Sequence, residues 1–264
     1  MNFLQIVAMA LRLWRQHLTL YTLAALMLFL CAFISAGLFS GALLTDALLA
    51  LAFGPSGAWA QNPLVVLGML ASTVIGFLAS TVLLCAGTGA YLRSCAQIAA
   101  GSREVNLMGF VEYASAQGLS FWFITMCMLI LCAVFSVPVA AAGILFSSYG
   151  AWVLPLSLVI ALSIALLVAL PFWLSYSAQV VHRKGALPSL LSSVKASAHS
   201  PVASLVLLVI LLALFFAPMV SLVFYPIYFF LIFMPVAGNL MLVYYEAAQG
   251  LLHEPKPAPA MQRR

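Results

Sequence analysis

Charged residues are scarce in this chain of 264 residues. Lys and Arg together number 10 and Asp and Glu number 5, so 6% of the residues are charged, whereas 66% are hydrophobic. A water-soluble globule of this size needs many more polar side chains to cover its surface. The composition therefore excludes a soluble protein and indicates a chain that lies within a membrane.

Alternation of apolar and polar residues is also missing. Membrane-spanning strands alternate between lipid-facing and lumen-facing side chains, whereas the apolar runs here continue over about 20 residues. Only helices and closed barrels satisfy the hydrogen bonds of the backbone inside lipid. We therefore predict an all-α membrane protein.

Motifs that carry chemistry are missing as well. The sequence has no Gly-x-Ser-x-Gly elbow, no Gly-rich phosphate loop, no His-Glu-x-x-His helix and no pair of histidines one helical turn apart. The basic residues are scattered and are not interleaved with aromatic residues, as nucleic-acid binding would require. We therefore expect no catalytic residue, no metal ligand, no cofactor and no nucleic-acid partner.

What the sequence does contain is a rhythm of apolar runs. Six of them cover residues 18–43, 64–91, 121–146, 152–180, 201–224 and 225–250, and amphipathic segments at about 2–17, 107–118 and 185–200 precede the first, third and fifth. This pattern predicts a polytopic bundle of six transmembrane helices, arranged as three parallel hairpin units, each preceded by an amphipathic surface helix. Residues 1–251 form one predicted transmembrane domain, and the proline-rich segment 252–264 is a predicted disordered tail.

Basic residues fall on one side of this predicted map. They precede the first run, lie between the second and third and between the fourth and fifth, and follow the sixth, whereas the other side has Asp46 and no Lys or Arg. Because Lys and Arg collect in cytoplasmic loops, we predict a multi-pass protein of the bacterial inner membrane with both termini cytoplasmic. The residues predicted to contact anionic lipids are Arg93, Arg183, Lys184 and Lys195. Ordinary control of topology explains the same charges.

Asn239 is the one strongly polar side chain near the middle of a predicted span. A carboxamide in hydrocarbon needs a partner, so Asn239 is expected to face the interior of the bundle, either as a ligand site or bonded to a neighbouring helix. Pro171, Pro218 and Pro235 stand in aromatic surroundings, where they either break helices around a substrate cavity or shape packing. For both features we favour the packing interpretation.

Four stretches together resemble a known group of membrane proteins. They are the amphipathic start with Leu11, Trp14 and Arg15, the segments GAYLRSCAQIAAG and ALPSLLSSVKASAHS, and the closing LMLVYYEAAQG. The layout resembles six-span bacterial membrane proteins of uncharacterised function, including the membrane domain in front of some glycerophosphodiester phosphodiesterases. The resemblance implies a domain without catalytic residues of its own, and the hydrolase activity is not expected because that domain is absent from this sequence.

The sequence supports two hypotheses about function. The first is a non-enzymatic integral inner-membrane protein that binds or scaffolds a protein partner or a lipid at its cytoplasmic face, since three surface helices would enlarge that face. The alternative is a transporter or lipid-handling protein whose cavity lies near Pro171, Pro218, Pro235 and Asn239. The oligomeric state stays open at this point.

Overall fold

A computed structural model describes residues 3–52, 62–150, 152–182, 185–216 and 225–250. These ranges are helical or form turns and short links, with no strand among them. Pro218, Arg183, Lys184 and the predicted tail 252–264 lie outside the described residues. The α-helices are α1 (Phe3–Gln16), α2 (Leu18–Ala52), α3 (Pro63–Ala99), α4 (Leu107–Leu145), α5 (Val153–Ala169), α6 (Ser175–His182), α7 (Ala186–His199), α8 (Pro201–Phe216), α9 (Tyr225–Tyr228) and α10 (Met234–Ala248).

Three of these helices are long and apolar enough to cross a membrane. They are α2, α3 and α4, with 35, 37 and 39 residues, and the pair α7 and α8, bent by 105°, is a possible fourth span. The all-α fold of a membrane protein is therefore confirmed for the described residues. The number of six spans stays a prediction.

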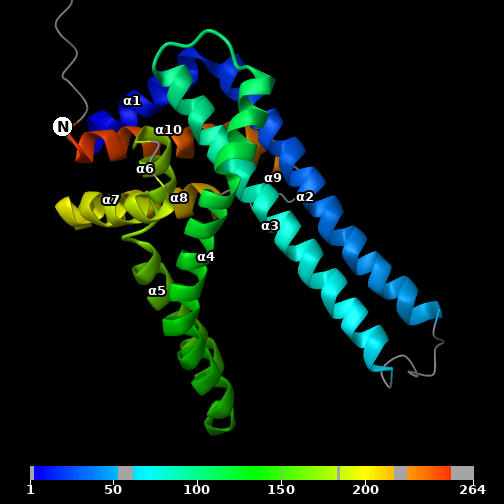
Figure 1. The fold of residues 1–264 in the computed structure, drawn as a ribbon. Coiled ribbons are helices and arrows are strands. Elements are labelled where there is room, and N and C mark those ends of the chain that lie inside the picture. The colour runs from blue at the N-terminus through cyan, green and yellow to red at the C-terminus, as the bar shows by residue number, and fades with distance from the viewer. Residues whose placement is uncertain (1–2, 53–61, 151, 183–184, 217–224, 251–264) are drawn as a thin grey trace, which may run out of the picture. The chain divides into compact units, whose positions relative to one another are not determined.

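The chain forms two compact units. One, here called the hairpin unit, is Thr19–Thr125, and the other, here called the terminal unit, combines Met1–Leu18 with Met126–Arg264. In the hairpin unit α2 and α3 run side by side along most of their length (Figure 1). The boundary between the units falls within α4, so this helix contributes to both.

Small residues bring the helices of the hairpin unit together. A Cβ atom added at Gly87 would lie 2.8 Å from Cβ of Cys31 in α2, and one added at Gly118 would lie 2.8 Å from Cβ of Ala86 in α3. The hydroxyl groups of Ser35 and Ser80 are 2.8 Å apart across α2 and α3. Since lipid supplies no hydrophobic drive between helices, such close packing and hydrogen bonding hold them together.

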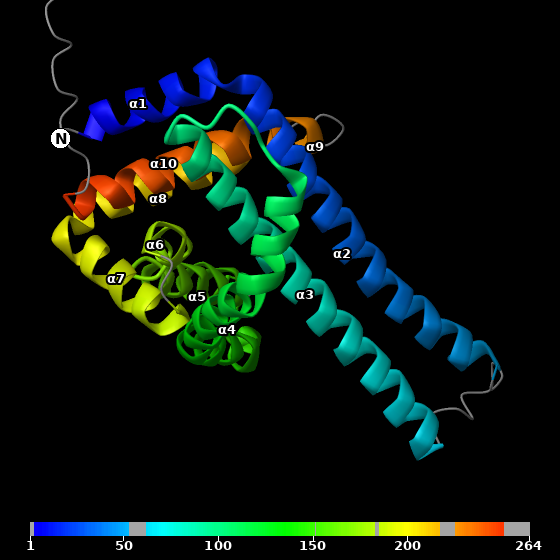
Figure 2. The ribbon, with the colours of Figure 1, turned by 45° about the horizontal axis from the view of Figure 1, so that its top comes forward.

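In the terminal unit, α1 lies along α10 (Figure 2). Ile6 and Ala10 of α1 are buried in a core that also contains Leu240 and Tyr245 of α10. The apolar face of α1 is thus covered by protein, and the opposite face carries its polar residues, as the amphipathic pattern requires. The prediction of a separate amphipathic helix before the first long helix is confirmed.

The second predicted surface helix is not a separate element. Residues 107–118 are the first turns of α4, which continues without a break to Leu145. The helix starts where the predicted segment starts. The side-chain oxygen of Asn106 caps it by accepting a hydrogen bond from the backbone N–H of Met108 at 2.9 Å. The prediction of a separate surface helix over 107–118 is wrong, because Gly118 does not interrupt the helix but packs from within α4 against Ala86 of α3.

The first and fourth predicted spans also differ from the structure. Helix α2 continues past residue 43 to Ala52, which includes Asp46 in the helix rather than in an outer loop. The fourth run breaks into α5 and α6, with turns at residues 170–174 around Pro171. Proline cannot donate a hydrogen bond and collides with the preceding turn, which accounts for the break.

Candidate functional site

Asn239 lies inside the terminal unit. Its side chain is fully buried in α10, and Pro235 one turn earlier is buried as well. Burial of a carboxamide is tolerated when it has polar partners, and Asn239 does make an interaction within the chain. This position agrees with the expected inward-facing side chain.

The break at Pro171 is closed by serines of α7. The hydroxyl of Ser193 donates to the carbonyl oxygen of Pro171 at 2.8 Å, and that of Ser197 donates to the carbonyl oxygen of Leu170 at 3.3 Å. Both serines are buried. The carbonyl groups that the break sets free are thereby satisfied inside the protein, as buried backbone groups must be.

Pro235 stands at the start of α10 after a wider helical turn. Residues Phe229–Phe233 form a π-helical turn, at the end of which the N–H of Met234 donates to the carbonyl oxygen of Phe229. Such a turn accommodates the missing donor and the ring of the following proline. Pro171 is thus bound to α7 and Pro235 follows this turn, so each proline has a local structural role.

Of the four cations predicted to contact lipid, two can be placed. Lys195 is exposed on α7, and Arg93 is half-buried on α3, while Arg183 and Lys184 lie outside the described residues. Lys195 belongs to the terminal unit and Arg93 to the hairpin unit.

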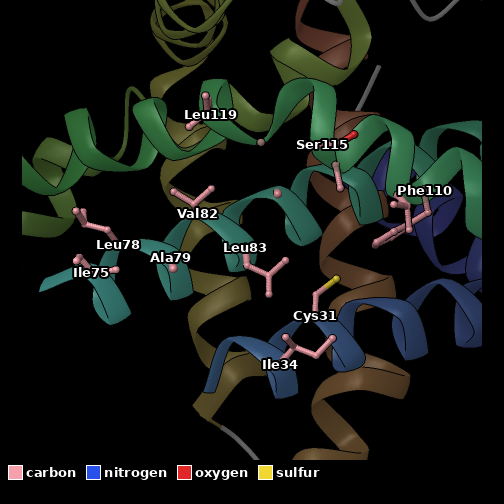
Figure 3. Close-up of a pocket in the computed structure, with 14 residues that line it drawn as sticks. Cys31, Ile34, Ile75, Leu78, Ala79, Val82, Leu83, Phe110, Ser115 and Leu119 are labelled. Atoms are coloured by element: carbon pink, nitrogen blue, oxygen red, sulfur yellow. The ribbon is translucent and has the colours of Figure 1, made fainter. Parts of the chain in front are cut away.

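A large apolar groove lies within the hairpin unit. It has a volume of about 770 Å³ and opens to the surface of this unit between α2, α3 and the first turns of α4. Figure 3 shows the lining side chains on these three helices. They are Cys31, Ile34, Ile75, Leu78, Ala79, Val82, Leu83, Ala86, Phe110, Val111, Ala114, Ser115, Gly118 and Leu119. This volume falls in the range of about 300 to 1,000 Å³ that is typical of ligand sites.

The groove offers almost no hydrogen-bonding group to an occupant. Its one hydroxyl, that of Ser115, donates to the carbonyl oxygen of Glu112 in its own helix at 2.9 Å. Cys31 contributes a thiol, which behaves as a small apolar group. The remaining lining residues are aliphatic, glycine or phenylalanine. Such a surface suits a hydrocarbon chain and disfavours a polar solute, because burying unpaired polar groups of the solute is costly.

A cation stands beyond one end of the groove. The guanidinium carbon of Arg93 lies 4.4 Å from the ring centroid of Tyr113, a cation–π contact between α3 and α4. The same ring packs against Phe121, with centroids 6.1 Å apart. The aromatic pair thus holds Arg93 close to the groove residue Phe110, which precedes Tyr113 by about one turn of α4.

The groove was not predicted from the sequence. Its α3 residues occur at spacings of three and four, from Ile75 to Ala86, and this signal is present in the printed sequence. The small residues in this part of the second run indicate helix packing. Groove-lining and lipid-facing side chains are equally apolar, however, so only the arrangement of three helices distinguishes them.

Outside the groove, the described residues contain no group of three His, Cys, Asp or Glu side chains that could hold a metal ion. Asp46 is buried between α2 and α3, where its carboxylate accepts a hydrogen bond from the hydroxyl of Thr73.

Comparison of the chain with protein-family models, curated proteins and solved structures finds no match.

Proposed function

We propose that this chain is a non-enzymatic integral membrane protein that binds the acyl chain of a lipid in the groove of the hairpin unit. The observation that carries the proposal is the nearly complete absence of polar groups from a groove of about 770 Å³. A water-soluble substrate would lose its hydration there without replacement. A hydrocarbon chain leaves no polar group unpaired in such a groove, and its binding from the surrounding lipid depends on close packing against the lining side chains.

The dimensions of the groove fit a lipid chain. From Ile75 to Ala86 the groove follows eleven steps of α3, about 16 Å at 1.5 Å for each residue. Half of a hydrocarbon core about 30 Å thick is about 15 Å. A chain lying along this length would therefore reach from the headgroup level of one leaflet to the middle of the membrane.

The membrane context proposed here is the one expected from the sequence: six spans in the bacterial inner membrane with both termini cytoplasmic. Beyond α2, α3 and α4, the apolar helices α5 and α8 have 17 and 16 residues, which is about 25 Å each. Residues 225–248 form a continuous helical stretch with a π-helical turn at Phe229–Phe233, near its start. These segments supply three further spans of somewhat uneven length.

A transport function near Pro171 and Asn239 receives no comparable support. Transporters leave the backbone groups of broken helices available to the substrate or coupling ion. Here the freed carbonyl groups of Leu170 and Pro171 already accept hydrogen bonds from Ser197 and Ser193. The proposal therefore places ligand binding in the groove and a structural role at the break.

The test is native mass spectrometry of the full chain released gently from its own membrane. We expect a retained phospholipid in the wild-type protein and its loss in Ala79→Phe, whose ring would fill the groove. Ala71→Phe is the matched control, because Ala71 is also exposed on α3 and does not line the groove. Retention in the control and loss in Ala79→Phe support the proposal.

A second pair on α4 repeats the test on the facing wall. Ser115→Phe fills the groove from α4. Ala116→Phe is its control, because Ala116 is exposed on the same helix and lies outside the groove lining. Equal lipid retention in all four variants would contradict the proposal. A stoichiometric protein bound to the wild type and released by the two groove variants would also contradict it, in favour of a protein partner.

A further inference from the structure

Arg93 lies on the same face of α3 as the groove lining, beyond the end of the groove at Ala86. The lining residues Ile75, Ala79, Val82 and Ala86 follow each other at intervals of three or four. Arg93 comes seven residues after Ala86, which is close to two full turns, so it lies on the same face of the helix. A ligand that fills the groove and extends past Ala86 therefore meets this guanidinium.

Among the described residues, Arg93 contacts an aromatic ring and forms no ion pair. Its guanidinium carbon lies over the ring of Tyr113, 4.4 Å from the centroid. The N–H groups of a guanidinium lie in its plane and can bind two oxygens of a phosphate at once. Tyr113 is buried, so its contact with Arg93 also restricts where the cation can move.

We propose that the occupant of the groove is an anionic phospholipid whose phosphate is bound by Arg93 while one acyl chain fills the groove. This inference rests on the proposed function, because it needs an acyl chain in the groove. The apolar lining accounts for the chain, and the charge of Arg93 at the end of the same α3 face accounts for the headgroup. A phosphodiester close to a fixed cation gives a preference for lipids with net negative charge.

The overall charge of this region does not produce the same preference. The stretch from Arg93 to Glu112 contains two cations, Arg93 and Arg103, and two acids, Glu104 and Glu112. Arg103, Glu104 and Glu112 are all exposed. Since these charges balance, the stretch is not a basic surface. A preference for anionic lipid must therefore come from the position of Arg93 on the groove face of α3.

The experiment compares two lipids that share the same acyl chains, phosphatidylglycerol and phosphatidylcholine. The full-length protein is delipidated in detergent, incubated with an equal mixture of the two, and the retained lipid is counted by native mass spectrometry. We expect the wild type to retain phosphatidylglycerol over phosphatidylcholine by about fivefold, because the choline cation of phosphatidylcholine offsets the attraction between its phosphate and Arg93. Arg93→Gln should retain both lipids about equally.

Arg103→Gln is the matched control, because it removes the same charge from the same stretch but not from the groove face of α3. It should keep the wild-type preference. Loss of the preference in Arg103→Gln to the same extent as in Arg93→Gln would overturn the inference and indicate a general charge effect. Because each measurement is a ratio of two lipids on one protein, a change in the amount of folded protein does not alter it.

Failure of the inference and failure of the proposed function give different results. If the wild type retains both lipids equally and Ala79→Phe releases both, the groove binds acyl chains and the assignment of Arg93 is wrong. If Ala79→Phe retains lipid as Ala71→Phe does, the groove itself is not the binding site. If Arg93→Gln does not fold, the inference is tested by the wild type alone. A wild type that retains phosphatidylglycerol and phosphatidylcholine equally then overturns it.

Discussion

Gly118 of α4 packs directly on Ala86 of α3: a Cβ atom added to the glycine would lie 2.8 Å from the Cβ of the alanine. Both residues line the apolar groove. Because neither has a side chain beyond Cβ, the two helices approach closely here, while the larger side chains around them line the walls. The depth of the groove therefore depends on this pair of small residues.

The first prediction concerns that contact. Gly118→Ala should destabilise the protein by about 1 to 3 kcal/mol, because the new methyl group must push α3 and α4 apart. Gly109→Ala is the control in the same helix, since its added Cβ would meet only Asn106, at 3.8 Å. Thermal unfolding in detergent measures both, and equal melting temperatures for the two variants would contradict the packing described here.

A second prediction concerns the serine that closes the break after α5. Ser193→Ala should lower the free energy of unfolding by about 1 to 3 kcal/mol, because it leaves the carbonyl oxygen of Pro171 buried without its donor. Ser163→Ala is the control, because the hydroxyl of Ser163 is exposed and bonds within its own helix to Val159. A destabilisation no larger than that of the control would show that the break does not depend on Ser193.

Asn239 provides a third prediction. Asn239→Leu should lower stability, since it removes a fully buried polar group and its interaction, yet it should leave lipid retention at the wild-type level. The reason is that Asn239 lies outside the groove lining. Lipid counting by native mass spectrometry at a temperature where the variant is folded gives the answer. Selective loss of lipid at unchanged stability would assign ligand binding to Asn239 instead.

The fourth prediction tests the orientation of the hairpin unit. Cysteine introduced at Asn62, the exposed cap of α3, should react with a membrane-impermeant thiol reagent added outside spheroplasts. Cysteine at the exposed Glu104 should react only after the membrane is opened, because the neighbouring arginines assign this stretch to the cytoplasm. Labelling of the unmodified chain gives the background from its own thiols. The reverse order of reactivity would invert the proposed topology.

Composition was enough to predict the class of fold, since long apolar runs with so few charges permit little else. The local amphipathic pattern of residues 2–17 also predicted α1 as a separate helix. The continuity of α4 could not be predicted, because Gly118 is compatible with a helix end or with close packing. Its contact with Ala86, distant in sequence, decides between them.

The candidate sites also divide into features that the sequence predicts and features that depend on contacts between distant residues. Arg93 was predicted to contact lipid from its charge and its place in the chain, whereas Ser193 and Ser197 carry no sequence signal for a partner more than 20 residues away. The groove escaped prediction for a different reason. Hydropathy gives Ala79 of the groove and Ala71 of the lipid-facing surface the same value, and only the placement of α2 and α4 separates them.

The most direct test of lipid binding in the groove is photo-crosslinking with a phospholipid that carries a diazirine in its acyl chain. The lipid is incorporated with the full-length protein into nanodiscs, irradiated, and the adducts are located by peptide mass spectrometry. The proposed site predicts adducts concentrated on the lining residues of α2, α3 and α4, and their loss in Ala79→Phe but not in Ala71→Phe. Adducts spread evenly over all exposed apolar faces, unchanged by Ala79→Phe, would contradict it.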